Sequence, residues 1–559
     1  MSEESAANAM NWDEATSALL SVGSPFEMTT ETILGEKMAV FSKRAPSLRA
    51  LLAQSANHGD SEYYVFDTGE RCSFIENVDR VAALASALAD KGIVKGDRIA
   101  ILSANNPQWL TIYWAVVSLG GVVVAMNGWW SAEEVSRGLR AADPSLLFLD
   151  RRRLERIDEV DTGVPTLLIE DTVEEMIHAN AGETLPEVEL SEDDPAVLLF
   201  TSGTTGQPKG ALLSHRNVIG FVMTAFFLGA RMSMINPGQR ATPGVYLAAF
   251  PLFHVAGLFT SATTQLAAGS KTVWTTGRFD AGKVIELSRQ EKITNWSGAA
   301  THIWRLLDHP AFEGFDGTQL SGVAIGGSAT TPELIRATEE RLPHLMGTFA
   351  SGYGSTETGS LISHASNAML MADSASVGPP LPGVEVRIVD DSGEAVEDGI
   401  DGNILVRSAL VMLGYWDNDE ANADTLLPGR WLKTGDFGQL RDGQLRLASR
   451  KRDLIIRGGE NIYPAEVENR LEQHPDVAEV AVFGVDHREL GQEVKAVVVP
   501  LERSSPSEAD LKAWVAEALA YFKVPAHVEV RDEPMPRNAT GKILKNVLRG
   551  DSENLFVEE

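Results

Sequence analysis

The chain has 559 residues, 44% of them hydrophobic, so it is long enough for several domains with sizeable cores. Its one cysteine, Cys72, excludes a disulfide framework and a cysteine-based zinc site, and it favours a reducing compartment, so we expect a cytoplasmic protein. The 48 Lys and Arg residues face 78 Asp and Glu residues, and the net charge of −30 disfavours binding to nucleic acid or to an anionic membrane surface.

Helical and strand patterns alternate through the first part of the chain. Apolar residues recur at helical spacing in some segments, and short apolar runs separate them. The predicted helices cover 81–88, 109–117 and the segment after Ser131, and the predicted strands cover 98–102, 122–124 and 146–149. Because helices between apolar strands are typical of parallel sheets covered on both faces, we expect an α/β fold with doubly wound, mostly parallel sheets.

An uncharged stretch from Leu110 to Trp130 resembles a membrane span in length. Gly120-Gly121 and Asn127-Gly128 divide it into a helix-like part and a Val-rich strand. We therefore interpret it as a buried helix–turn–strand unit and expect no membrane span.

The character of the sequence changes near residue 450. A basic cluster, Arg450-Lys451-Arg452, precedes the glycine pair Gly458-Gly459, and a small α+β unit follows. In that unit we expect helices over 465–473 and 508–521, and strands over 478–485 and 493–499. The predicted organisation is a large N-terminal domain in subdomains (1–448), a hinge (449–453) and a small mobile C-terminal domain (454–559).

The segment from Leu198 to Gly210 is a strand of apolar residues that ends in hydroxyl residues, glycines and a lysine. Glycines allow a ligand to approach the backbone, backbone N–H groups and hydroxyls donate to phosphate oxygens, and the lysine offsets phosphate charge. Such a local concentration of donors is needed if an acidic protein binds a nucleotide. A flexible glycine turn is the alternative. The predicted contacts are Thr201, Ser202, Gly203, Thr204, Thr205, Gly206 and Lys209.

This loop resembles the signature loop of the adenylate-forming superfamily, which contains acyl-CoA synthetases, luciferases and the adenylation domains of peptide synthetases. The other motifs of that family appear in the expected order between about residue 70 and residue 545. The resemblance implies that the chain activates a carboxylic acid with ATP as an acyl-adenylate. The acyl group then passes to a thiol, with release of AMP and pyrophosphate.

The second motif runs from Ser351 to Glu357. Tyr353 offers a flat face for a purine, Thr356 a hydroxyl for the α-phosphate, and Glu357 an oxygen ligand for Mg²⁺. The resemblance implies these same contacts and adds Ser351 and Gly354 to the nucleotide site, with Thr201 as a second metal contact. A glycine-rich loop with a surface glutamate is the alternative interpretation.

Two further segments complete the expected nucleotide site. Asp436, in Lys433-Thr434-Gly435-Asp436, matches the family's ribose-binding aspartate, and Arg450 matches the arginine that assists it. Spacing alone is equally compatible with Asp436 capping a turn. Upstream, Gly327 and Ser328 resemble the loop that lies against the adenine and the substrate carboxylate.

The C-terminal segment from Pro536 to Leu544 resembles the family's mobile catalytic loop, and Lys542 matches its lysine. Adenylation requires a carboxylate to attack a polyanionic phosphate. A lysine between the two anions lowers their repulsion and stabilises the charge that develops. We therefore assign Lys542 to the catalytic step.

The resemblance also implies a rotation of the small domain between the two steps, with Arg452 at the pivot. The rotation presents the segment from Gly458 to Pro464 to the site, where Gly458 and Gly459 leave room for pantetheine. Ser449 replaces the glycine that is usual before Arg450. His254, in Pro251-Leu252-Phe253-His254, resembles the family residue near the acyl carboxylate and the thiol tunnel, although a histidine among apolar residues is often structural.

Other classes of protein fit the residues less well. A P-loop ATPase needs Gly-Lys-Ser/Thr, but Gly210 follows Lys209, and the chain has no G-x-S-x-G elbow of a serine hydrolase. A nucleotide-binding protein without catalysis predicts the loss of Lys542 or Glu357, and both are present. Within the family, loading of a carrier protein supplied in trans stays open, and nothing supports a luciferase-type monooxygenase.

We therefore predict an acyl-CoA ligase that uses ATP, Mg²⁺ and coenzyme A and is compatible with a homodimer. The acid pocket is expected at Trp296–Thr301, at His254 and at the Gly326-Gly327 and Ala350-Ser351-Gly352 stretches. Because these residues are mostly small, they favour a medium- or long-chain fatty acid, or an aromatic acid, over acetate.

Overall fold

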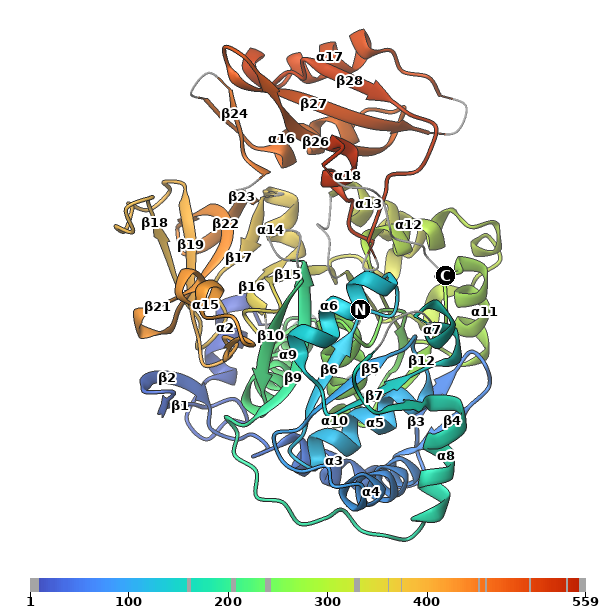
Figure 1. Ribbon diagram of the computed structural model, residues 1–559. Helices are drawn as coiled ribbons and strands as arrows, with labels where there is room; N and C mark the ends of the chain where they lie inside the picture. The colour runs from blue at the N-terminus through green and yellow to red at the C-terminus, as the bar shows by residue number, and fades with distance from the viewer. Residues whose placement is uncertain are drawn as a thin grey trace.

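The computed structural model of the chain describes residues 10–157, 162–202, 208–236, 243–325, 332–359, 361–373, 375–450, 453–457, 460–501, 504–538 and 541–551. Figure 1 shows a large body built on three sheets, with a smaller unit above it that the end of the chain forms. The fold is α/β with a large N-terminal domain and a smaller C-terminal domain, as the sequence patterns predict.

The first sheet is parallel at its centre. On one side of this centre, β9 and β10 form an antiparallel hairpin, and β20 pairs with β10 at the edge of the sheet. In spatial order the strands are β20 (Gly414–Tyr415), β10 (Pro208–Ser214), β9 (Pro195–Ser202), β6 (Val122–Met126), β5 (Arg98–Leu102), β7 (Leu146–Leu149) and β8 (Thr166–Leu168).

The second sheet is parallel except at one edge, where β4 pairs antiparallel with β3. Its order is β14 (Gly322–Ile325), β13 (Asn295–Gly298), β11 (Val245–Ala248), β12 (Lys271–Trp274), β3 (Glu62–Phe66) and β4 (Arg71–Ser73). The carboxyl ends of β11, β13 and β14 therefore lie side by side, as is typical of ligand sites in α/β sheets.

Helices connect and cover these two sheets (Figure 1). They are α3 (Leu48–Ser55), α4 (Phe74–Asp90), α5 (Pro107–Ser118), α6 (Ala132–Ala142), α7 (Arg151–Arg156), α8 (Ile169–Ala179), α9 (His215–Ile235), α10 (Gln265–Ala268), α11 (Ala281–Gln290), α12 (Ala300–Asp308) and α13 (Pro332–Arg341). Capping boxes at Ser73 and Ser131 begin α4 and α6. Helix α6 starts after Ser131 as predicted, whereas α4 starts well before the predicted residue 81 because Ser73 caps it.

The uncharged stretch from Leu110 to Trp130 is the buried unit that the sequence predicts. Its helix, α5, and its strand, β6, lie in the largest apolar core, which also contains residues of β3, β5 and α4 and so joins both sheets. Among the described residues, one helix, α9, is long and apolar enough to cross a membrane, and half of its apolar window is buried in the protein. Residues from the first half of α9 pack into the same core as α5 and β6.

The third sheet is antiparallel, and the alternating pattern did not predict it. Its order is β17 (Ser376–Gly378), β23 (Gln444–Arg450), β22 (Trp431–Arg441), β19 (Gly402–Arg407) and β18 (Glu385–Val389), with β21 (Leu426–Leu427) beside β22. A short hairpin of β15 (Ala350–Gly354) and β16 (Leu361–Ser366) precedes it, and the helices α14 (Asn367–Ala372) and α15 (Asp419–Thr425) accompany it. Strand β23 runs through Arg450 into the predicted hinge segment.

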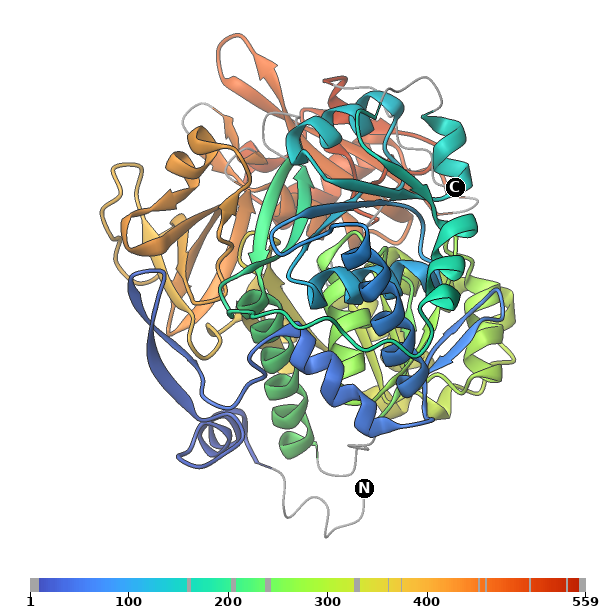
Figure 2. The same ribbon diagram turned by 60° about the horizontal axis from the view of Figure 1, so that its bottom comes forward.

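An N-terminal segment lies against this sheet and α9 (Figure 2). Helix α2 (Trp12–Leu19) packs on α9, and the hairpin of β1 (Met28–Ile33) and β2 (Glu36–Phe41) lies beside the third sheet. Arg407 of β19 donates to the carbonyl of Lys37 at 2.9 Å. The segment therefore joins two subdomains of the large body.

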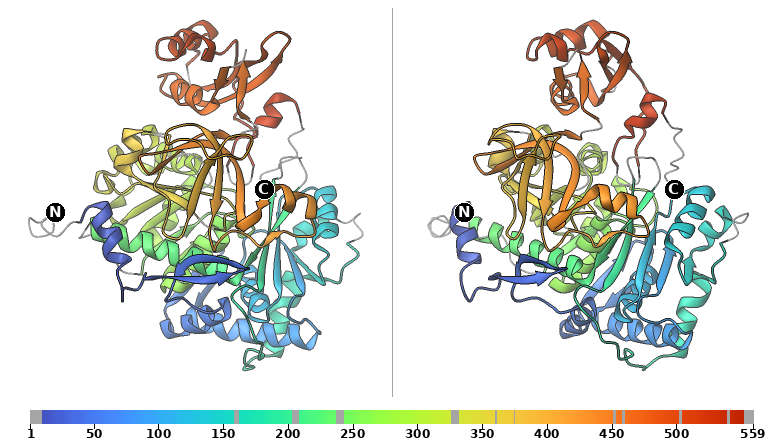
Figure 3. Two further views of the ribbon diagram at one scale, coloured as in Figure 1. Left: turned by 90° about the vertical axis from the view of Figure 1, so that its left-hand side faces the viewer. Right: turned by 60° about the vertical axis from the view of Figure 1, so that its left-hand side comes forward.

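The small unit has its own sheet and its own apolar core. Its strands are β25 (Glu460–Ile462), β24 (Ile455–Arg457), β27 (Gly491–Pro500), β26 (Val477–His487) and β28 (His527–Val530), and its helices are α16 (Pro464–Glu472), α17 (Glu508–Ala516) and α18 (Lys545–Arg549). Helix α17 ends earlier than the predicted residue 521. Both views of Figure 3 show this unit standing clear of the large body above a narrow junction.

Candidate active site

The candidate residues of the large domain come from three places in the fold. They are the β9–β10 hairpin, the strand β15 with the turn that follows it, and the β22–β23 pair. Figure 1 shows that these elements lie in the part of the large body that faces the small unit. Sequence-distant motifs thus meet at one face.

The β9–β10 hairpin carries the first motif. Thr201 and Lys209 are partners across the two strands, and the Thr201 hydroxyl lies 3.5 Å from the Lys209 carbonyl. Ser202 ends β9, whereas Gly203, Thr204, Thr205 and Gly206 lie outside the described residues. The described strands fix the two ends of the loop at the carboxyl end of β9, where a phosphate-binding loop is expected.

Tyr415 links this hairpin to the metal-binding candidate, Glu357. The Tyr415 hydroxyl donates to Glu357 Oε1 at 3.0 Å, and the Lys209 ammonium lies 5.1 Å from the centroid of the Tyr415 ring. Burial and the Glu357 charge raise the pKa of Tyr415, so its hydroxyl stays a donor. Tyr415 belongs to no predicted motif, and only the pairing of β20 with β10 brings it here.

The turn that carries Glu357 is held by neighbouring backbone. The Glu357 carbonyl accepts from the Met412 N–H at 2.9 Å. Thr356 precedes Glu357 in the same turn, and the Ser355 N–H donates to the Thr358 hydroxyl at 2.8 Å. The carboxylate is therefore presented by a fixed turn, which favours a binding role over that of a surface glutamate.

Tyr353 and Asp436 meet although they are far apart in the sequence. The Tyr353 hydroxyl donates to Asp436 Oδ2 at 2.5 Å. Asp436 of β22 is the register partner of Arg450 of β23, so the predicted ribose residues are neighbours on adjacent strands. Ser351 and Gly354 lie on the same strand, β15, as Tyr353. The ring predicted to stack on adenine and the carboxylate predicted to bind ribose are thus adjacent.

His254 follows β11 in a largely buried turn. Its Nε2 atom is buried without a hydrogen-bond partner, and burial lowers the pKa of this imidazole to about 4. The ring is therefore neutral at physiological pH. Directly after it, residues Ala256–Thr264 form a π-helix, a conformation often found at functional sites. A Cβ at Gly257 would lie 2.1 Å from the Pro251 carbonyl, so only glycine fits this close turn.

The loop that carries Lys542 belongs to the small unit but contacts the large one. Within the loop, the Asn538 N–H donates to the Lys542 carbonyl at 2.9 Å, and the Lys542 N–H donates to Asn538 Oδ1 at 2.9 Å. Gly541 is so close to the start of α12 that a Cβ there would lie 3.0 Å from Thr301 Oγ1 and 3.1 Å from Ala299 Cβ. The lysine loop therefore touches the carboxyl end of β13.

His302 is a further polar residue at this contact that the sequence patterns did not single out. Its ring stacks on Phe279 with the centroids 4.1 Å apart, and its Nδ1 accepts from the Ala299 N–H at 3.3 Å. Burial, with the charges of Arg305 and Arg537, lowers the pKa of His302 to about 4. Arg537 comes from the lysine loop, where it donates to the Gly541 carbonyl at 2.6 Å.

Some predicted residues are not placed. Gly327 and Ser328, the pivot Arg452, and Gly458 and Gly459 lie outside the described residues. By contrast, Trp296 is fully buried, stacks on Phe315 and donates to Ser288, so it is a core residue beneath the expected acid pocket.

The metal-binding candidates do not form a cage of protein ligands. The described residues contain no cluster of three or more His, Cys, Asp or Glu that could hold a metal ion. Mg²⁺ in nucleotide sites is usually bound by one or two protein oxygens together with phosphate oxygens and waters. The Glu357 carboxylate, near the β9–β10 hairpin through Tyr415, fits this mode of binding.

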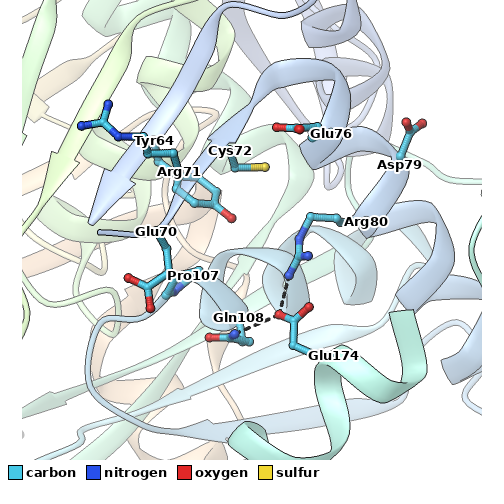
Figure 4. Close-up of a pocket in the computed structure, with 10 residues that line it drawn as sticks. All are labelled: Tyr64, Glu70, Arg71, Cys72, Glu76, Asp79, Arg80, Pro107, Gln108 and Glu174. Carbon is cyan, nitrogen blue, oxygen red and sulfur yellow. Dashed lines mark hydrogen bonds and ion pairs between the residues drawn. The ribbon is translucent and has the colours of Figure 1, made fainter. Parts of the chain in front are cut away.

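A cavity of about 470 Å³ lies elsewhere, beside β3, β4, α4 and α8 (Figure 4). Arg80 and Glu174 form an ion pair of 2.5 Å in it, and Gln108 donates to the same carboxylate at 2.9 Å. Burial raises the pKa of Cys72 to about 11, so this thiol is not reactive. The cavity lies at the opposite end of the large body from the small unit (Figure 1) and does not include the candidate residues above.

A two-domain α/β body that gathers the predicted phosphate, adenine and ribose residues on one part and the predicted lysine on the other is the arrangement expected of an adenylate-forming enzyme. The family model described as AMP-binding enzyme matches residues 51–416, and the model described as AMP-binding enzyme C-terminal domain matches residues 466–542. The chain belongs to the AMP-binding enzyme family. It is an AMP-forming acid–thiol ligase, with ATP and coenzyme A as substrates.

Known relatives support this assignment over most of the chain. Indoleacetate–CoA ligase of Aromatoleum aromaticum is 33% identical, covering 85% of this chain and 92% of the relative. Long-chain-fatty-acid–CoA ligase of Bacillus subtilis is 30% identical, covering 92% and 96%. The crystal structure of ATP-bound MatB from Rhodopseudomonas palustris is 28% identical, has a TM-score of 0.80, and covers 92% of this chain and 100% of its own.

Proposed function

We propose that this ligase activates a medium- or long-chain fatty acid and transfers the acyl group to coenzyme A. In the first step a carboxylate oxygen attacks the α-phosphorus of ATP, and the bond to the β-phosphate oxygen breaks to release pyrophosphate. In the second step the thiol sulfur attacks the acyl carbon and AMP leaves. The same site must therefore bind two anions and later admit a thiol.

The residues of the large domain are proposed to hold the nucleotide. Lys209 and the hydroxyls of the β9–β10 hairpin would bind the triphosphate, Tyr353 the adenine and Asp436 the ribose. The 2.5 Å contact between Tyr353 and Asp436 supports this, because one nucleoside can reach both groups at once. Thr356 would donate to the α-phosphate from the turn that also carries Glu357.

Mg²⁺ is proposed to bind at Glu357, with Thr201 as a second oxygen near it. When bound, it would neutralise phosphate charge and so supply electrostatic stabilisation. The donor set fits, since Glu357 keeps one carboxylate oxygen beyond the one that Tyr415 contacts at 3.0 Å.

Lys542 is proposed to stabilise the developing charge during adenylation. The observation that carries this role is the contact of Gly541 with Thr301 and Ala299, which brings the lysine loop of the small unit to the large domain. A lysine delivered in this way acts in one arrangement of the domains and withdraws in another, which suits a two-step reaction.

The acid is proposed to bind where β11 and β13 end. Residues 298–300 are Gly, Ala and Ala at the carboxyl end of β13, next to the lysine loop, so small side chains border the expected path of the acyl chain. His254 after β11 is neutral, so it adds no positive charge to this region. Room and low polarity favour a long apolar acid.

An aromatic acid is the second candidate. The flat stack of His302 on Phe279, with Phe250 6.2 Å from the His302 ring, would suit a planar group. One relative is named for indoleacetate and another for long-chain fatty acids, so the family includes both classes.

The test is ATP-dependent AMP formation with coenzyme A across acetate, octanoate, palmitate, indoleacetate and ferulate. We expect the highest kcat/KM with octanoate or palmitate. A higher kcat/KM with the two aromatic acids would establish the second candidate, and a preference for acetate would contradict both. A parallel reaction with a phosphopantetheine-loaded carrier protein in place of coenzyme A distinguishes the thiol acceptor.

A further inference from the structure

A second contact joins the two units at Tyr463, the residue before α16. Tyr463 comes directly after β25 in the small unit, in the segment that the family resemblance assigns to the thiol step. Its side chain reaches the third sheet of the large domain, far in sequence from its own strand. The small unit thus touches the large one through the lysine loop and through this tyrosine.

The tyrosine is held by two different interactions. Its hydroxyl donates to Asp401 Oδ2 at 2.7 Å, and its ring stacks on Phe437 with the centroids 6.4 Å apart and the planes 25° apart. The other carboxylate oxygen of Asp401 accepts from Gln439 Nε2 at 3.0 Å. Asp401 is therefore also held by a residue of the large domain, and as a charged acceptor it favours a strong hydrogen bond.

The docking position lies next to the nucleotide site. Phe437 immediately follows Asp436 on β22, so one strand presents the proposed ribose carboxylate and the surface on which Tyr463 stacks. In the same arrangement Gly541 lies against Thr301 and Ala299, with the lysine loop at the large domain. Tyr463 is thus docked while Lys542 is delivered.

We propose that the Tyr463–Asp401–Phe437 contact is a latch that holds the small domain in the lysine-delivering arrangement, so that Tyr463 is a positioning residue for adenylation. The inference rests on the proposed two-step function. The segment containing Tyr463 must leave this contact before it can face the site for thiol transfer. The strength of the latch therefore sets how the enzyme divides its time between the two steps.

The direct test uses Tyr463→Phe, which keeps the ring and its stacking but removes the hydroxyl. Adenylation is measured by ATP–pyrophosphate exchange, and thiol transfer is measured separately with a chemically supplied acyl-adenylate and coenzyme A. We expect exchange to fall by about tenfold, equivalent to ~1.4 kcal/mol, while transfer is unchanged or faster.

Tyr521→Phe is the matched control, because Tyr521 lies in the same small unit, makes no side-chain hydrogen bond in the described structure and is 83% exposed. This variant should leave both half-reactions unchanged. A fall in both half-reactions by the same factor in Tyr463→Phe, or no change in either, would overturn the latch.

A cycle with Asp401→Ala tests the pair itself. If the hydroxyl acts through Asp401, adding Tyr463→Phe to Asp401→Ala should change the exchange rate by less than twofold further. Multiplicative effects of the two substitutions would show that Tyr463 acts elsewhere.

A readout without catalysis separates the latch from the proposed function. Cys72 is only 3% exposed, so cysteines introduced at the exposed Met346 of the large domain and Val530 of the small one can be labelled selectively with a fluorescent pair. With ATP and Mg²⁺ present, the parent protein should show one main energy-transfer efficiency, that of the docked arrangement. In Tyr463→Phe, a smaller fraction of molecules should show this efficiency. An unchanged distribution overturns the latch, whereas absence of exchange with every acid in the parent protein overturns the proposed function instead.

Discussion

The two halves of the candidate site are built differently. On the large domain, Tyr353, Asp436, Glu357 and Lys209 lie on strands or fixed turns and contact one another or Tyr415 directly. On the small unit, Lys542 lies on a loop whose described contact with the large domain is made by Gly541. The difference teaches that the proposed nucleotide residues are preorganised by the large domain, whereas the proposed catalytic lysine depends on how the small unit sits against it.

Removing the Lys542 ammonium should have the largest effect on activity. Lys542→Ala is expected to lower ATP–pyrophosphate exchange by about 10²–10³-fold, because a charge-stabilising donor at the reacting phosphate is lost. Transfer from a supplied acyl-adenylate to coenzyme A should be retained. Lys512→Ala, on α17 of the same unit, is the matched control and should leave exchange unchanged. Exchange at the parental rate in Lys542→Ala would remove the lysine from the mechanism.

A substitution on the preorganised side should weaken binding instead. Asp436→Ala is expected to raise the KM for ATP by roughly 10–100-fold, since hydrogen bonds to a charged group contribute about 1.5–3 kcal/mol. The thiol-transfer step should also weaken, because the acyl-adenylate contains the same ribose. Isothermal titration with ATP gives the affinity directly, and Asp60→Ala, on the exposed surface, should not change it. An unaltered affinity in Asp436→Ala would place the ribose elsewhere.

The delivery contact can be disturbed without touching a functional group. Gly541 has φ +78° and lies against Thr301, so Gly541→Ala adds both backbone strain and a close contact. We expect exchange to fall by about tenfold, as a contact shift of a few tenths of an ångström misplaces the lysine. Gly550→Ala has similar strain, at φ +84° with no atom within 4 Å of the new Cβ, and should reduce stability alone. Equal exchange rates in the two variants would show that the contact of Gly541 with Thr301 does not position Lys542.

Several parts of the candidate site could be proposed from the sequence because they depend on local chemistry. The hydroxyl and glycine run after β9, the turn with Glu357 and the lysine loop each carry their residue types in a short segment. The partners that join these segments were not. Tyr415 reaches Glu357 because β20 pairs with β10, and Tyr463 reaches Asp401 because two domains meet. Such contacts depend on tertiary structure, which spacing in one sequence does not report.

The fold shows the same division. Helical and apolar patterns predicted β5, β7, the later part of α4 and the helix capped by Ser131, because capping and burial act locally, but the Ser73 cap of α4 was missed. The antiparallel third sheet was missed, since its strands are half-exposed and read as mixed polar segments. The hinge and domain limits at 448 and 454 stay predictions.

The smallest expected effect concerns the domain interface and pH. Burial, with the charges of Glu468 and Glu333, raises the pKa of Glu472 to about 8. Glu333 belongs to α13 of the large domain. Lys545 forms an ion pair with Glu468 at 2.7 Å. Between the unfolded pKa near 4.5 and pH 8 the folded state binds more protons, so stability falls as pH rises.

Glu472→Gln keeps the side chain neutral and should remove this loss. We expect the melting temperature of the variant to exceed that of the parent by roughly 2–4 °C at pH 8.5, with little difference at pH 4.5. Glu489→Gln, on the exposed surface, is the control. A difference that does not grow with pH would show that the Glu472 carboxylate is not held neutral.

The most direct test of the two-part site is a crystal structure with ATP and Mg²⁺ bound. The account predicts adenine against Tyr353, ribose oxygens at Asp436, phosphates along the β9–β10 hairpin, and Lys542 Nζ within about 3 Å of an α-phosphate or ribose oxygen. A nucleotide bound away from both the hairpin and the lysine loop would contradict it.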